Sequence, residues 1–423
     1  MRKFYLETFG CKFNQAESEL IKRVLKEKGY KEASEREADF VVLVTCGVVE
    51  KTERKILKKA IWLKKRGKKI IFAGCLPLIS PKICKEIADG LVGPTNILNL
   101  PKIVKKVLKG KRAFSIKQKP VDKAKLKCFV IPKETCTAII PISEGCLSFC
   151  SYCATKLAKG NLRSFDKDAI LENIKEALRL GAKEIQLTSQ DLAIYGLDKG
   201  KFTLPELLKE ISKIEGDFRV RLGMMNPWGA KRVFSKILKI MQGEKFYKFL
   251  HLPLQSGSDR ILKLMNRNYK VKDFFELVSE FRKKFKNSLL ATDVIVGFPT
   301  ETENDFQKTI SAIKRTKPEI LHIFRYSKRQ GTLASALKDF PERIKKERSR
   351  ILTKLFFEIC QKENKKYLGK IFEALITEKR KKTFLARLPS YKVVILKEGK
   401  LGEFIKVKIV SAKPNYLVGK LTR

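Results

Sequence analysis

The 423-residue chain is too long for a single hydrophobic core, which predicts two to four domains, and its 43% hydrophobic and 32% charged residues exclude a disordered chain. Its longest apolar run, residues 40–49, is half of the roughly 20 residues that a membrane-spanning helix needs, and no apolar signal core precedes the first acidic residue, so we expect a cytosolic protein without a membrane segment. Lys and Arg number 92 against 45 Asp and Glu, and the resulting formal charge of +47 favours a polyanionic partner such as RNA or DNA.

The first hundred residues alternate strand and helix signals. Short apolar runs at residues 3–6, 40–44 and 69–73 are typical of buried parallel strands. Between them, residues 15–28 and 50–65 have the apolar spacing of amphipathic helices. This pattern predicts a doubly wound α/β domain over residues 1–110. Residues 110–135 are basic, contain proline and lack periodicity, which indicates a linker.

Three cysteines of this first domain share one sequence context. Cys11, Cys46 and Cys75 each follow a predicted strand and adjoin a glycine. Because the carboxyl ends of parallel strands meet at one edge of a sheet, we expect the three thiols to converge. The alternative is three ordinary buried thiols, but those would lie within strands rather than just past their ends. The pattern therefore predicts a three-thiolate cluster site.

The middle of the chain repeats a strand–helix unit. Six strand signals recur between residues 136 and 325, namely TAIIPIS, KEIQLTS, FRVRLGM, YKFLHLPL, LATDVIVGF and ILHIFRY, with helical patterns between them. Six such units are two short of a closed eightfold barrel. We therefore predict an open, partial (β/α)6 barrel in a domain of residues 132–360.

The loop after the first barrel strand reads ISEGCLSFCSYC and places Cys146, Cys150 and Cys153 in a CxxxCxxC spacing. Three thiolates can hold three irons of a [4Fe–4S] cluster and leave the fourth iron open. The amino and carboxylate groups of S-adenosylmethionine can chelate that iron, and the reduced cluster can then release a carbon radical. A zinc knuckle is the alternative, but zinc prefers four ligands in paired sets, and no fourth ligand stands nearby.

The remaining cysteines show no ligand-like spacing. Ten cysteines in a chain without a secretion signal argue against structural disulfides. We expect the other four to be core or incidental thiols, and they are Cys84, Cys128, Cys136 and Cys360.

After a predicted basic helix over residues 342–366, the sequence pattern changes from helical to strand-like. Five short strand signals follow, namely IFEALIT, TFLA, YKVVIL, FIKVKIVS and YLVG. They predict a small β-barrel domain over residues 361–423, of the kind that binds oligonucleotides. Its 17 Lys and Arg against 5 Asp and Glu, a net charge of +12, favour RNA. The Lys-rich surface of a thermophile is an alternative for the whole chain, but it would raise Lys and Glu together.

Taken together, these motifs resemble those of the methylthiotransferases of the radical S-adenosylmethionine superfamily. The resemblance covers essentially the whole chain, and the ending resembles the TRAM domain, a small RNA-binding barrel. The matching segments are FGCKFNQAESE, VTCGVV, AGC, EGCLSFCSYC, AKGNLRS, LTSQDLAIYG, HLPLQSGSD, RNY and TDVIVGFPTET. Two positions depart from the family pattern. Lys159 stands where an Arg usually precedes the glycine, and Gln330 stands where the family normally has Pro.

Within that family, LTSQDLAIYG and HLPLQSGSD are most similar to the archaeal and eukaryotic branch. That branch adds a methylthio group to C2 of N6-threonylcarbamoyladenosine, next to the anticodon of tRNA. The resemblance therefore implies an enzyme with two [4Fe–4S] clusters, one held by Cys146, Cys150 and Cys153 and an auxiliary one held by Cys11, Cys46 and Cys75. It implies two S-adenosylmethionine molecules per turnover, one that methylates sulfur on the auxiliary cluster and one that is cleaved at the first.

The resemblance also suggests cofactor contacts and partners. Tyr152 would line the adenine of the cofactor, and Gln190, at the end of the second barrel strand, would bind its amino group. Gln255, at the end of another barrel strand, is a further expected contact. Local hydrogen bonding is the alternative role for both glutamines. No catalytic residue is indicated beyond the cluster ligands. The expected partners are tRNA and a flavodoxin- or ferredoxin-like reductant protein, and the sulfur donor is left open.

Three alternatives stay open at this point. Two are sister activities, methylthiolation of isopentenyladenosine in tRNA or of an aspartate in a ribosomal protein. The protein-modifying branch would not need so basic a chain. The third is a non-catalytic iron–sulfur protein that binds RNA, which would need no open iron.

Overall fold

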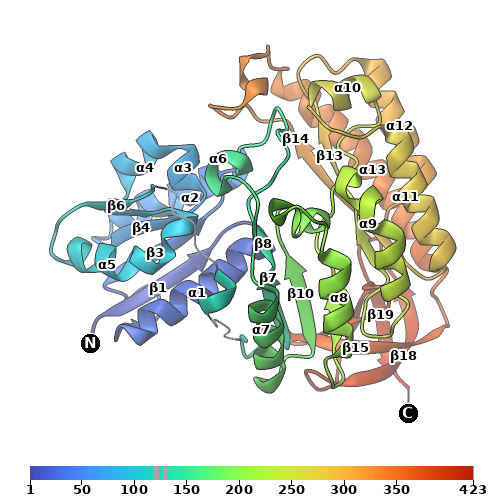
Figure 1. The fold of residues 1–423 in the computed structure, drawn as a ribbon, viewed down its shortest axis with the longest axis horizontal. Helices are drawn as coiled ribbons and strands as arrows, with labels where there is room; N and C mark the ends of the chain where they lie inside the picture. Colours follow the sequence, from blue (N-terminus) through green and yellow to red (C-terminus); the bar gives the residue numbers. More distant parts are fainter. Residues whose placement is uncertain (118–122, 127–130, 423) are drawn as a thin grey trace. The chain divides into compact units, whose positions relative to one another are not determined.

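A computed structural model of the 423-residue chain describes residues 1–117, 123–126 and 131–422 (Figure 1). The chain divides into two compact units. The first unit comprises Met1–Val130, Pro141–Asn173 and Ser327–Ala336, and the second comprises Ile131–Ile140, Ile174–Tyr326 and Leu337–Arg423. Within the described residues, every helix is too short or too polar to cross a membrane.

The first unit is built on a six-stranded sheet in the order β2-β1-β3-β4-β5-β6, and all of its paired strands are parallel. Apolar side chains cover both faces, so all six residues of the central strand β3 are buried. The strands are β1 (Lys3–Thr8), β2 (Lys31–Glu32), β3 (Phe40–Thr45), β4 (Lys69–Gly74), β5 (Gly90–Val92) and β6 (Ala113–Ser115).

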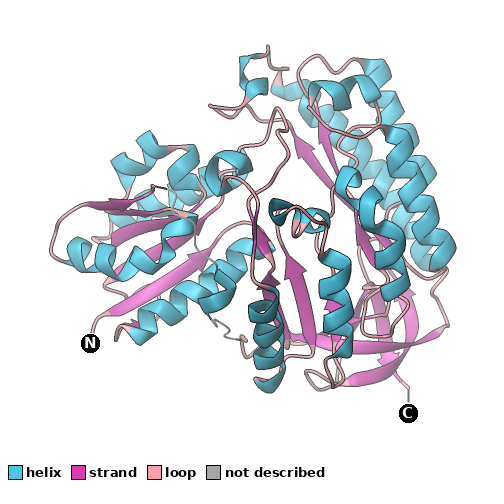
Figure 2. Cartoon of the chain, viewed as in Figure 1, coloured by secondary structure: helices cyan, strands magenta, loops and turns pink. Residues whose placement is uncertain are grey.

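Helices cover both faces of this sheet, as Figure 2 shows. Helices α1 (Lys12–Glu27) and α5 (Leu100–Leu108) pack on one face, and α2 (Glu50–Lys64) and α4 (Pro81–Ile87) pack on the other. The doubly wound α/β arrangement predicted from the sequence is confirmed.

The prediction of an aperiodic linker over residues 110–135 is wrong in part. Strand β6 falls inside it and pairs with β5, and residues 123–126 form the 3-10 helix η2 (Lys123–Leu126). Three-residue elements are too short to show a period in the sequence, and β6 is a strand because β5 offers it an open edge. Residues 118–122 and 127–130, including Cys128, lie outside the described residues.

The rest of the first unit consists of short elements around the predicted cysteine loop. Strands β8 and β9 form an antiparallel pair. The elements are α3 (Leu76–Ile79), η1 (Pro94–Asn99), β8 (Ser143–Glu144), α6 (Thr155–Lys159), β9 (Arg163–Ser164) and η5 (Leu333–Ala336).

The second unit contains the partial barrel. Its six strands form two parallel sheets, β11-β10-β7 and β12-β13-β14, which isolated parallel bridges such as Met224 to His251 join. These strands coincide with the six predicted strand signals, so the open six-stranded barrel is confirmed. They are β7 (Thr137–Pro141), β10 (Glu184–Thr188), β11 (Arg219–Arg221), β12 (Phe249–His251), β13 (Leu289–Val296) and β14 (Ile320–Arg325).

Helices follow these strands along the chain, with apolar faces of 3.6-residue spacing that predicted several of them from the sequence. They are α7 (Lys167–Arg179), η3 (Leu192–Ile194), η4 (Leu197–Lys199), α8 (Leu204–Lys213), α9 (Pro227–Ile240), α10 (Asp259–Leu264), α11 (Val271–Lys284), α12 (Glu303–Thr316) and α13 (Glu342–Lys365). Figure 1 shows helices α8, α9, α11 and α12 on the outer side of the barrel strands.

The last five strands close into a small barrel in the order β15-β16-β17-β19-β18, as predicted. Its interior is filled by apolar side chains such as Ile376, Val394 and Val407. Gly419 lies where a Cβ would stand 2.3 Å from a methyl carbon of Val407, so a larger residue would not fit inside. The strands are β15 (Ile371–Lys379), β16 (Phe384–Arg387), β17 (Val393–Leu396), β18 (Phe404–Ala412) and β19 (Leu417–Leu421).

Tyr391, in the β16–β17 turn of the small barrel, packs inside the six-stranded barrel. Its ring lies 4.9 Å from the ring of Phe249 on β12, and its hydroxyl accepts a hydrogen bond from Gln186 on β10 at 3.0 Å. The same apolar cluster includes Ile320 of β14. A single ring can contact β10, β12 and β14 only on their shared concave face, so Tyr391 closes one end of the barrel interior.

We expect Tyr391→Ala to lower the free energy of unfolding of the second unit by about 3 kcal/mol, because it leaves a cavity and removes one of the two acceptors of the Gln186 amide nitrogen. Urea unfolding followed by circular dichroism measures the change. Tyr416→Ala, at a half-exposed tyrosine of the same small barrel, is the control and should shift the midpoint little. Equal midpoints for the two variants would contradict the role given to Tyr391.

Candidate functional site

The cysteines predicted at the sheet edge lie at the carboxyl ends of three adjacent strands, β1, β3 and β4. Cys11 precedes the first residue of α1, Cys46 directly follows β3, and Cys75 directly follows β4. Cys46 and Cys75 are 9% and 5% exposed, whereas Cys11 is open to solvent. The fold therefore brings the three thiols to one edge of the sheet.

The side chain of Asn14 links the turn before Cys11 to the end of β3. Its side-chain Nδ2 donates to the carbonyl oxygens of Phe9 and Thr45, at 2.8 and 3.1 Å. Gly10 has a φ of +112°, and a Cβ there would stand 2.8 Å from the Cβ of Cys46. Only glycine suits that conformation and that space, so it lets the turn before α1 approach the end of β3.

The second set of cysteines, Cys146, Cys150 and Cys153, is half-buried on the loop between β8 and α6. Gly145 begins this loop with a φ of +84°, and a Cβ there would stand 2.0 Å from the carbonyl oxygen of Asn161. The backbone N–H of Ser148 donates to the Cys146 sulfur at 3.3 Å. Such N–H donors stabilise thiolates that hold a cluster.

Packing inside the first unit links the two cysteine sets. Cys75 and Ile79 form an apolar cluster with Ala154 and Ala158, and Ala154 directly follows Cys153. Both three-thiol sets are thus parts of one compact unit.

The segment Ser327–Ala336, which contains the SKRQGT motif, also belongs to this unit. Arg329 pairs with Glu53 on α2, and the backbone N–H of Ala334 donates to the carbonyl of Ser151 in the cysteine loop at 2.7 Å. Gln330, one of the two departures from the family pattern, is exposed between these contacts. The side chain that replaces the usual proline therefore lies at the surface of the described fold.

A buried group of charges, here the charge cluster, joins four segments of the first unit and consists of Glu17, Lys123, Glu144 and Lys159. Oε1 of Glu17 accepts from the ammonium groups of Lys123 and Lys159 at 2.5 and 2.7 Å. Oε1 of Glu144 accepts from the same two ammonium groups at 2.8 and 3.0 Å. None of the four side chains is more than 6% exposed. Arg163 reaches the other oxygen of Glu144 at 2.9 Å.

Mutual compensation keeps Glu144 and Lys159 charged despite their burial. Burial alone would raise the pKa of Glu144, but Lys123 and Lys159 lower it to about 2. Burial disfavours the charged form of Lys159, but Glu17 and Glu144 raise its pKa well above its usual value. The ring of Phe13 lies under both cations, 5.3 Å from Lys123 and 4.3 Å from Lys159.

Lys159 connects the charge cluster to both cysteine sets. It lies six residues after Cys153 along the chain. Burial raises the pKa of the Cys75 thiol, and the charge of Lys159 opposes that rise. A cation on α6, the helix that follows one cysteine loop, therefore acts on a thiol of the other set.

The departure at Lys159 has a visible consequence. Oε2 of Glu17 is buried and has no hydrogen-bond partner among the described residues. An ammonium group is a point donor, whereas the guanidinium of an arginine could serve both oxygens of one carboxylate. The chain keeps the positive charge of the family pattern but leaves one acceptor unsatisfied.

The predicted cofactor contacts are divided between the units. Tyr152 precedes Cys153 in the cysteine loop and is half-buried. Gln190 belongs to the second unit and follows β10. Gln255 lies four residues after the end of β12, has a φ of +62° and forms an isolated parallel bridge with Val294 of β13. Its backbone N–H donates to the carbonyl oxygen of Asp293 at 2.8 Å. Their contact with a cofactor stays a prediction.

Three of the other cysteines are buried thiols within the described fold. Cys84 belongs to the core of the first unit, and the Cys360 sulfur lies 3.8 Å from the carbonyl oxygen of Glu319. The Cys136 thiol donates to the carbonyl oxygen of Ile376 at 3.4 Å. These contacts agree with structural rather than ligand roles.

The donor chemistry of both cysteine sets fits iron–sulfur clusters. Each set supplies three cysteine thiols that form no disulfide, and thiolates are the ligands that such clusters prefer. The sequence indicated these six residues but not the charge cluster around them. The two glutamates could have been noticed only because they lie close to the cysteines in the sequence. Glu17 lies within FGCKFNQAESE, and Glu144 lies two residues before Cys146.

Comparison with known proteins places the chain in a family. Sequence profiles match the Radical SAM superfamily at residues 140–313, the Uncharacterized protein family UPF0004 at residues 3–92 and the TRAM domain at residues 365–422. The chain is 47% identical over 420 residues to the "Probable threonylcarbamoyladenosine tRNA methylthiotransferase" of Archaeoglobus fulgidus, with 98% of each chain covered. The chain belongs to the tRNA methylthiotransferase family.

Other members of this family are similar over their full lengths. The protein of the same name from Pyrococcus abyssi is 41% identical over 426 residues, with 100% of each chain covered. The "tRNA-2-methylthio-N(6)-dimethylallyladenosine synthase" of Clostridium botulinum is 35% identical, with 99% of this chain and 96% of that protein covered.

A solved structure shares the fold. The radical S-adenosylmethionine methyltransferase TsrM from Kitasatospora setae, with tryptophan and a cofactor analogue bound, superposes with a TM-score of 0.58 at 11% identity. The match covers 79% of this chain and 75% of that one. At this identity the match supports the radical SAM fold of this methylthiotransferase and nothing finer.

We expect Lys159→Met to lower the free energy of unfolding of the first unit by about 3 kcal/mol, because two buried carboxylates lose a shared cation. Lys159→Arg should keep most of the stability, because its guanidinium can pair with both carboxylates. Lys125→Met is the control, since Lys125 is exposed two residues from Lys123. Anaerobic chemical unfolding measures all three. A Lys159→Met protein as stable as the control would show that the charge cluster contributes little.

Proposed function

We propose that the chain adds a methylthio group to C2 of N6-threonylcarbamoyladenosine in tRNA. The observation that carries the proposal is the joining of two three-thiol sets in one compact unit, where Cys75 packs on the segment that follows Cys153. One set suffices to generate a radical, whereas delivery of sulfur calls for a second site. The names of the archaeal relatives, which match over essentially the whole chain, supply the substrate.

Two [4Fe–4S] clusters would occupy these thiols, one on Cys146, Cys150 and Cys153 and one on Cys11, Cys46 and Cys75. Two S-adenosylmethionine molecules would serve each turnover. The first cluster, when bound, supplies reductive cleavage of S-adenosylmethionine to a carbon radical, which C2 requires because no general base could usefully deprotonate that carbon at pH 7.

The residues of the chain would position these reactants. Tyr152, Gln190 and Gln255 are proposed contacts of the cofactor. The charge cluster fixes α1, which begins beside Cys11, to α6, which follows the loop of the first set, through Glu17 and Lys159. A rigid link of this kind would hold the radical and the sulfur at a set separation.

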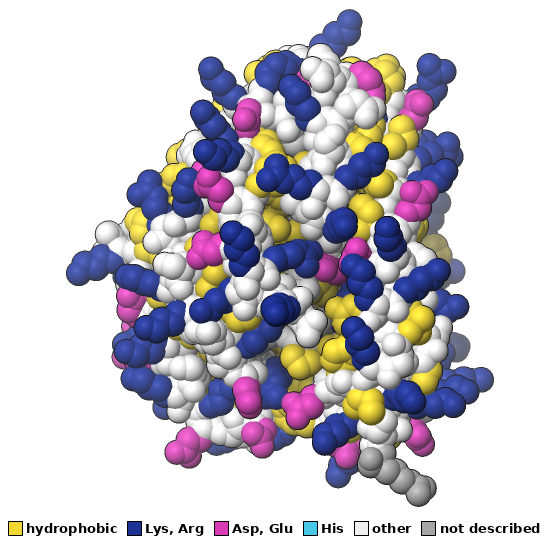
Figure 3. Space-filling model, turned by 90° about the vertical axis from the view of Figure 1, so that its right-hand side faces the viewer, with side chains coloured by type: hydrophobic (Ala, Val, Ile, Leu, Met, Phe, Trp, Pro, Cys, Tyr) yellow, Lys and Arg dark blue, Asp and Glu magenta, His cyan; other side chains and the backbone are white. Residues whose placement is uncertain are grey.

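Three functional parts are proposed, with the boundaries predicted from the sequence. Residues 1–110 would hold the auxiliary cluster, residues 132–360 the radical site, and residues 361–423 would bind RNA. Figure 3 shows Lys and Arg side chains across the whole of one face and far fewer Asp and Glu, which suits a polyanionic partner. A flavodoxin- or ferredoxin-like reductant and a location in the cytoplasm, with the tRNA, complete the proposal.

Isopentenyladenosine in tRNA is the second candidate substrate. The relative named for a dimethylallyladenosine product is 35% identical, against 47% for the relative named for threonylcarbamoyladenosine. The difference favours the threonylcarbamoyl substrate. Methylthiolation of a ribosomal-protein aspartate is less favoured, because the relatives from Archaeoglobus fulgidus, Pyrococcus abyssi and Clostridium botulinum are all named for tRNA.

Nucleoside mass spectrometry decides between the substrates. Anaerobically reconstituted protein with dithionite, sulfide and S-adenosylmethionine should convert N6-threonylcarbamoyladenosine in tRNA to its methylthio form. A parallel reaction with tRNA that carries isopentenyladenosine should give no product. Product from only the second tRNA would make isopentenyladenosine the substrate. Product from neither tRNA would refute tRNA methylthiolation.

Single cysteine replacements separate the two thiol sets. Wild-type protein should hold about eight irons per chain, and Cys46→Ala and Cys150→Ala about four each, because each cluster carries four. Cys150→Ala should abolish production of 5′-deoxyadenosine. Cys46→Ala should keep some uncoupled 5′-deoxyadenosine production but yield no methylthiolated tRNA, because its loss affects only the sulfur site.

Cys84→Ala is the matched control for these replacements, since Cys84 is a buried thiol of the same unit outside both sets. It should keep about eight irons and both products. Cleavage of the cofactor by Cys150→Ala would contradict the radical assignment. Wild-type methylthiolation by Cys46→Ala would contradict the second site.

A further inference from the structure

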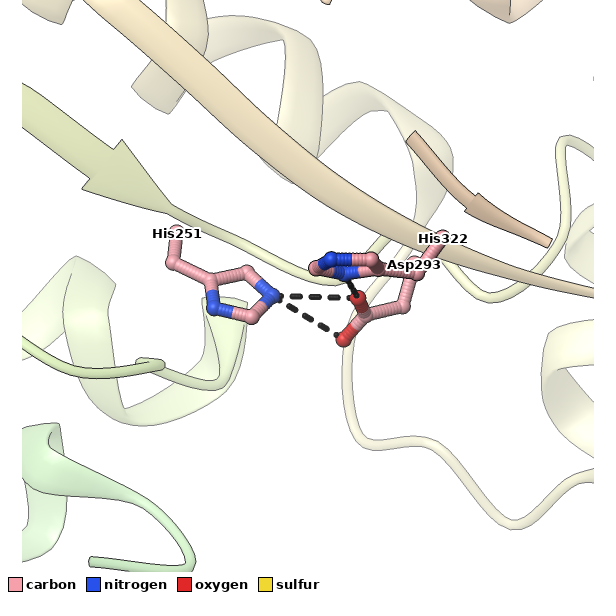
Figure 4. Close-up of side chains that lie close together, drawn as sticks. All are labelled: His251, Asp293 and His322. Atoms are coloured by element: carbon pink, nitrogen blue, oxygen red, sulfur yellow. Dashed lines mark hydrogen bonds and ion pairs between the residues drawn. The ribbon is translucent and has the colours of Figure 1, made fainter. Parts of the chain in front are cut away.

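The only two histidines of the chain meet on one carboxylate. Asp293 of β13 accepts hydrogen bonds from Nε2 of His251, at 3.0 Å and 3.1 Å to its two oxygens, and from Nδ1 of His322 at 2.7 Å. His251 ends β12, and His322 of β14 is the register partner of Asp293. Figure 4 shows the three side chains, here the His–Asp–His group, pointing toward one another.

The register of the strands places this group inside the barrel. Phe249, Ala291 and Ile320 pack in the cluster around Tyr391 on the concave face. His251, Asp293 and His322 come two residues later on the same three strands, so they face the same side, one layer nearer the carboxyl ends. In barrels of this class, ligands bind at the carboxyl ends of the strands.

The group remains open on one side. The side chains of His251 and Asp293 are 14% and 15% exposed, and that of His322 is 47% exposed. Below it the interior is closed by the aromatic layer of Tyr247, Phe249 and Tyr391. A ligand would therefore reach the group from the open side and touch His322 first.

The hydrogen bonds leave one nitrogen of each histidine unused by Asp293. Nδ1 of His251 and Nε2 of His322 have no hydrogen-bond partner within the described ranges. Burial alone would raise the pKa of Asp293, but His251 and His322 hold it well below its usual range. The carboxylate thus orients both rings and leaves their outer nitrogens for a ligand.

The same three side chains could in principle bind a divalent cation, since their ligand atoms all lie within 4.8 Å of one another. Each ring also keeps one nitrogen that does not contact Asp293, namely Nδ1 of His251 and Nε2 of His322. Those two nitrogens are the donors or acceptors that an organic ligand would use.

We propose that His322 and His251, oriented by Asp293, bind the polar N6 substituent of the target adenine and make the enzyme selective for threonylcarbamoyl over dimethylallyl groups. The inference rests on the proposed function. A threonylcarbamoyl group carries amide, hydroxyl and carboxylate groups that hydrogen-bond with imidazole nitrogens. A dimethylallyl group is a hydrocarbon that would cover those nitrogens without pairing them, and a site built for hydrogen bonds rejects such analogues strongly.

Binding of anticodon stem-loop RNAs tests this selectivity. Reconstituted wild-type protein should bind a loop with N6-threonylcarbamoyladenosine at least about tenfold more tightly than loops with isopentenyladenosine or plain adenosine, measured by fluorescence anisotropy. His322→Phe should reduce that ratio to about one, because its ring fills the space without a nitrogen. His322→Gln should restore part of it, because its amide can donate or accept.

Arg325→Gln is the control, since Arg325 lies on the opposite face of β14 and pairs with Glu342. It should keep the wild-type ratio. Iron content and urea midpoints near wild type would show that the His322 variants are folded. Failure of the proposed function is seen separately, as absence of methylthio product from wild-type protein in the nucleoside assay.

Two outcomes would overturn the inference while leaving the proposed function intact. The first is a His322→Phe protein that keeps the wild-type ratio. The second is about one equivalent of a metal other than iron in wild-type protein that Asp293→Asn lacks, which would make the group a metal site.

Discussion

Four buried charges hold together the part of the first unit that our proposal assigns to the chemistry. Glu17 and Glu144 share the ammonium groups of Lys123 and Lys159, and all four come from separate segments of the chain. Removing such charges from water is costly, so the arrangement is stable only when every member is present. Formation of the cluster therefore requires α1, the β8 segment and α6 to fold together, and these are the segments that carry or adjoin both cysteine sets.

In the second unit, an aromatic layer closes one end of the barrel interior, and a layer of polar side chains lies next to it. Tyr391 fills one end of the barrel interior and hydrogen-bonds to Gln186. The next layer along the same strands is the His–Asp–His group. Because the aromatic layer seals one end, a ligand in the interior would have to approach from the other end. The small barrel, proposed to bind RNA, thus also completes the barrel proposed to hold the modified base.

Much of the fold could be predicted from sequence because its signals are local. The six barrel strands carry apolar runs, and the cysteine loop has its ligands within eight residues. Strand β6 was missed because three residues show no period, and it pairs only because β5 is beside it. His251 and His322 had no local signal either, since they lie 71 positions apart and their partner Asp293 lies between them.

The sequence by itself determined which residues are proposed to carry the chemistry, through the spacing of Cys146, Cys150 and Cys153, the strand-end positions of Cys11, Cys46 and Cys75, and the excess of positive charge. Only the tertiary structure decided how these residues are held. It placed Lys159 between two buried carboxylates and set two histidines on one aspartate. The spacing of side chains along one strand or loop can be read from neighbouring residues in the sequence. Buried charge pairs, in contrast, form between segments that meet only after the chain has folded.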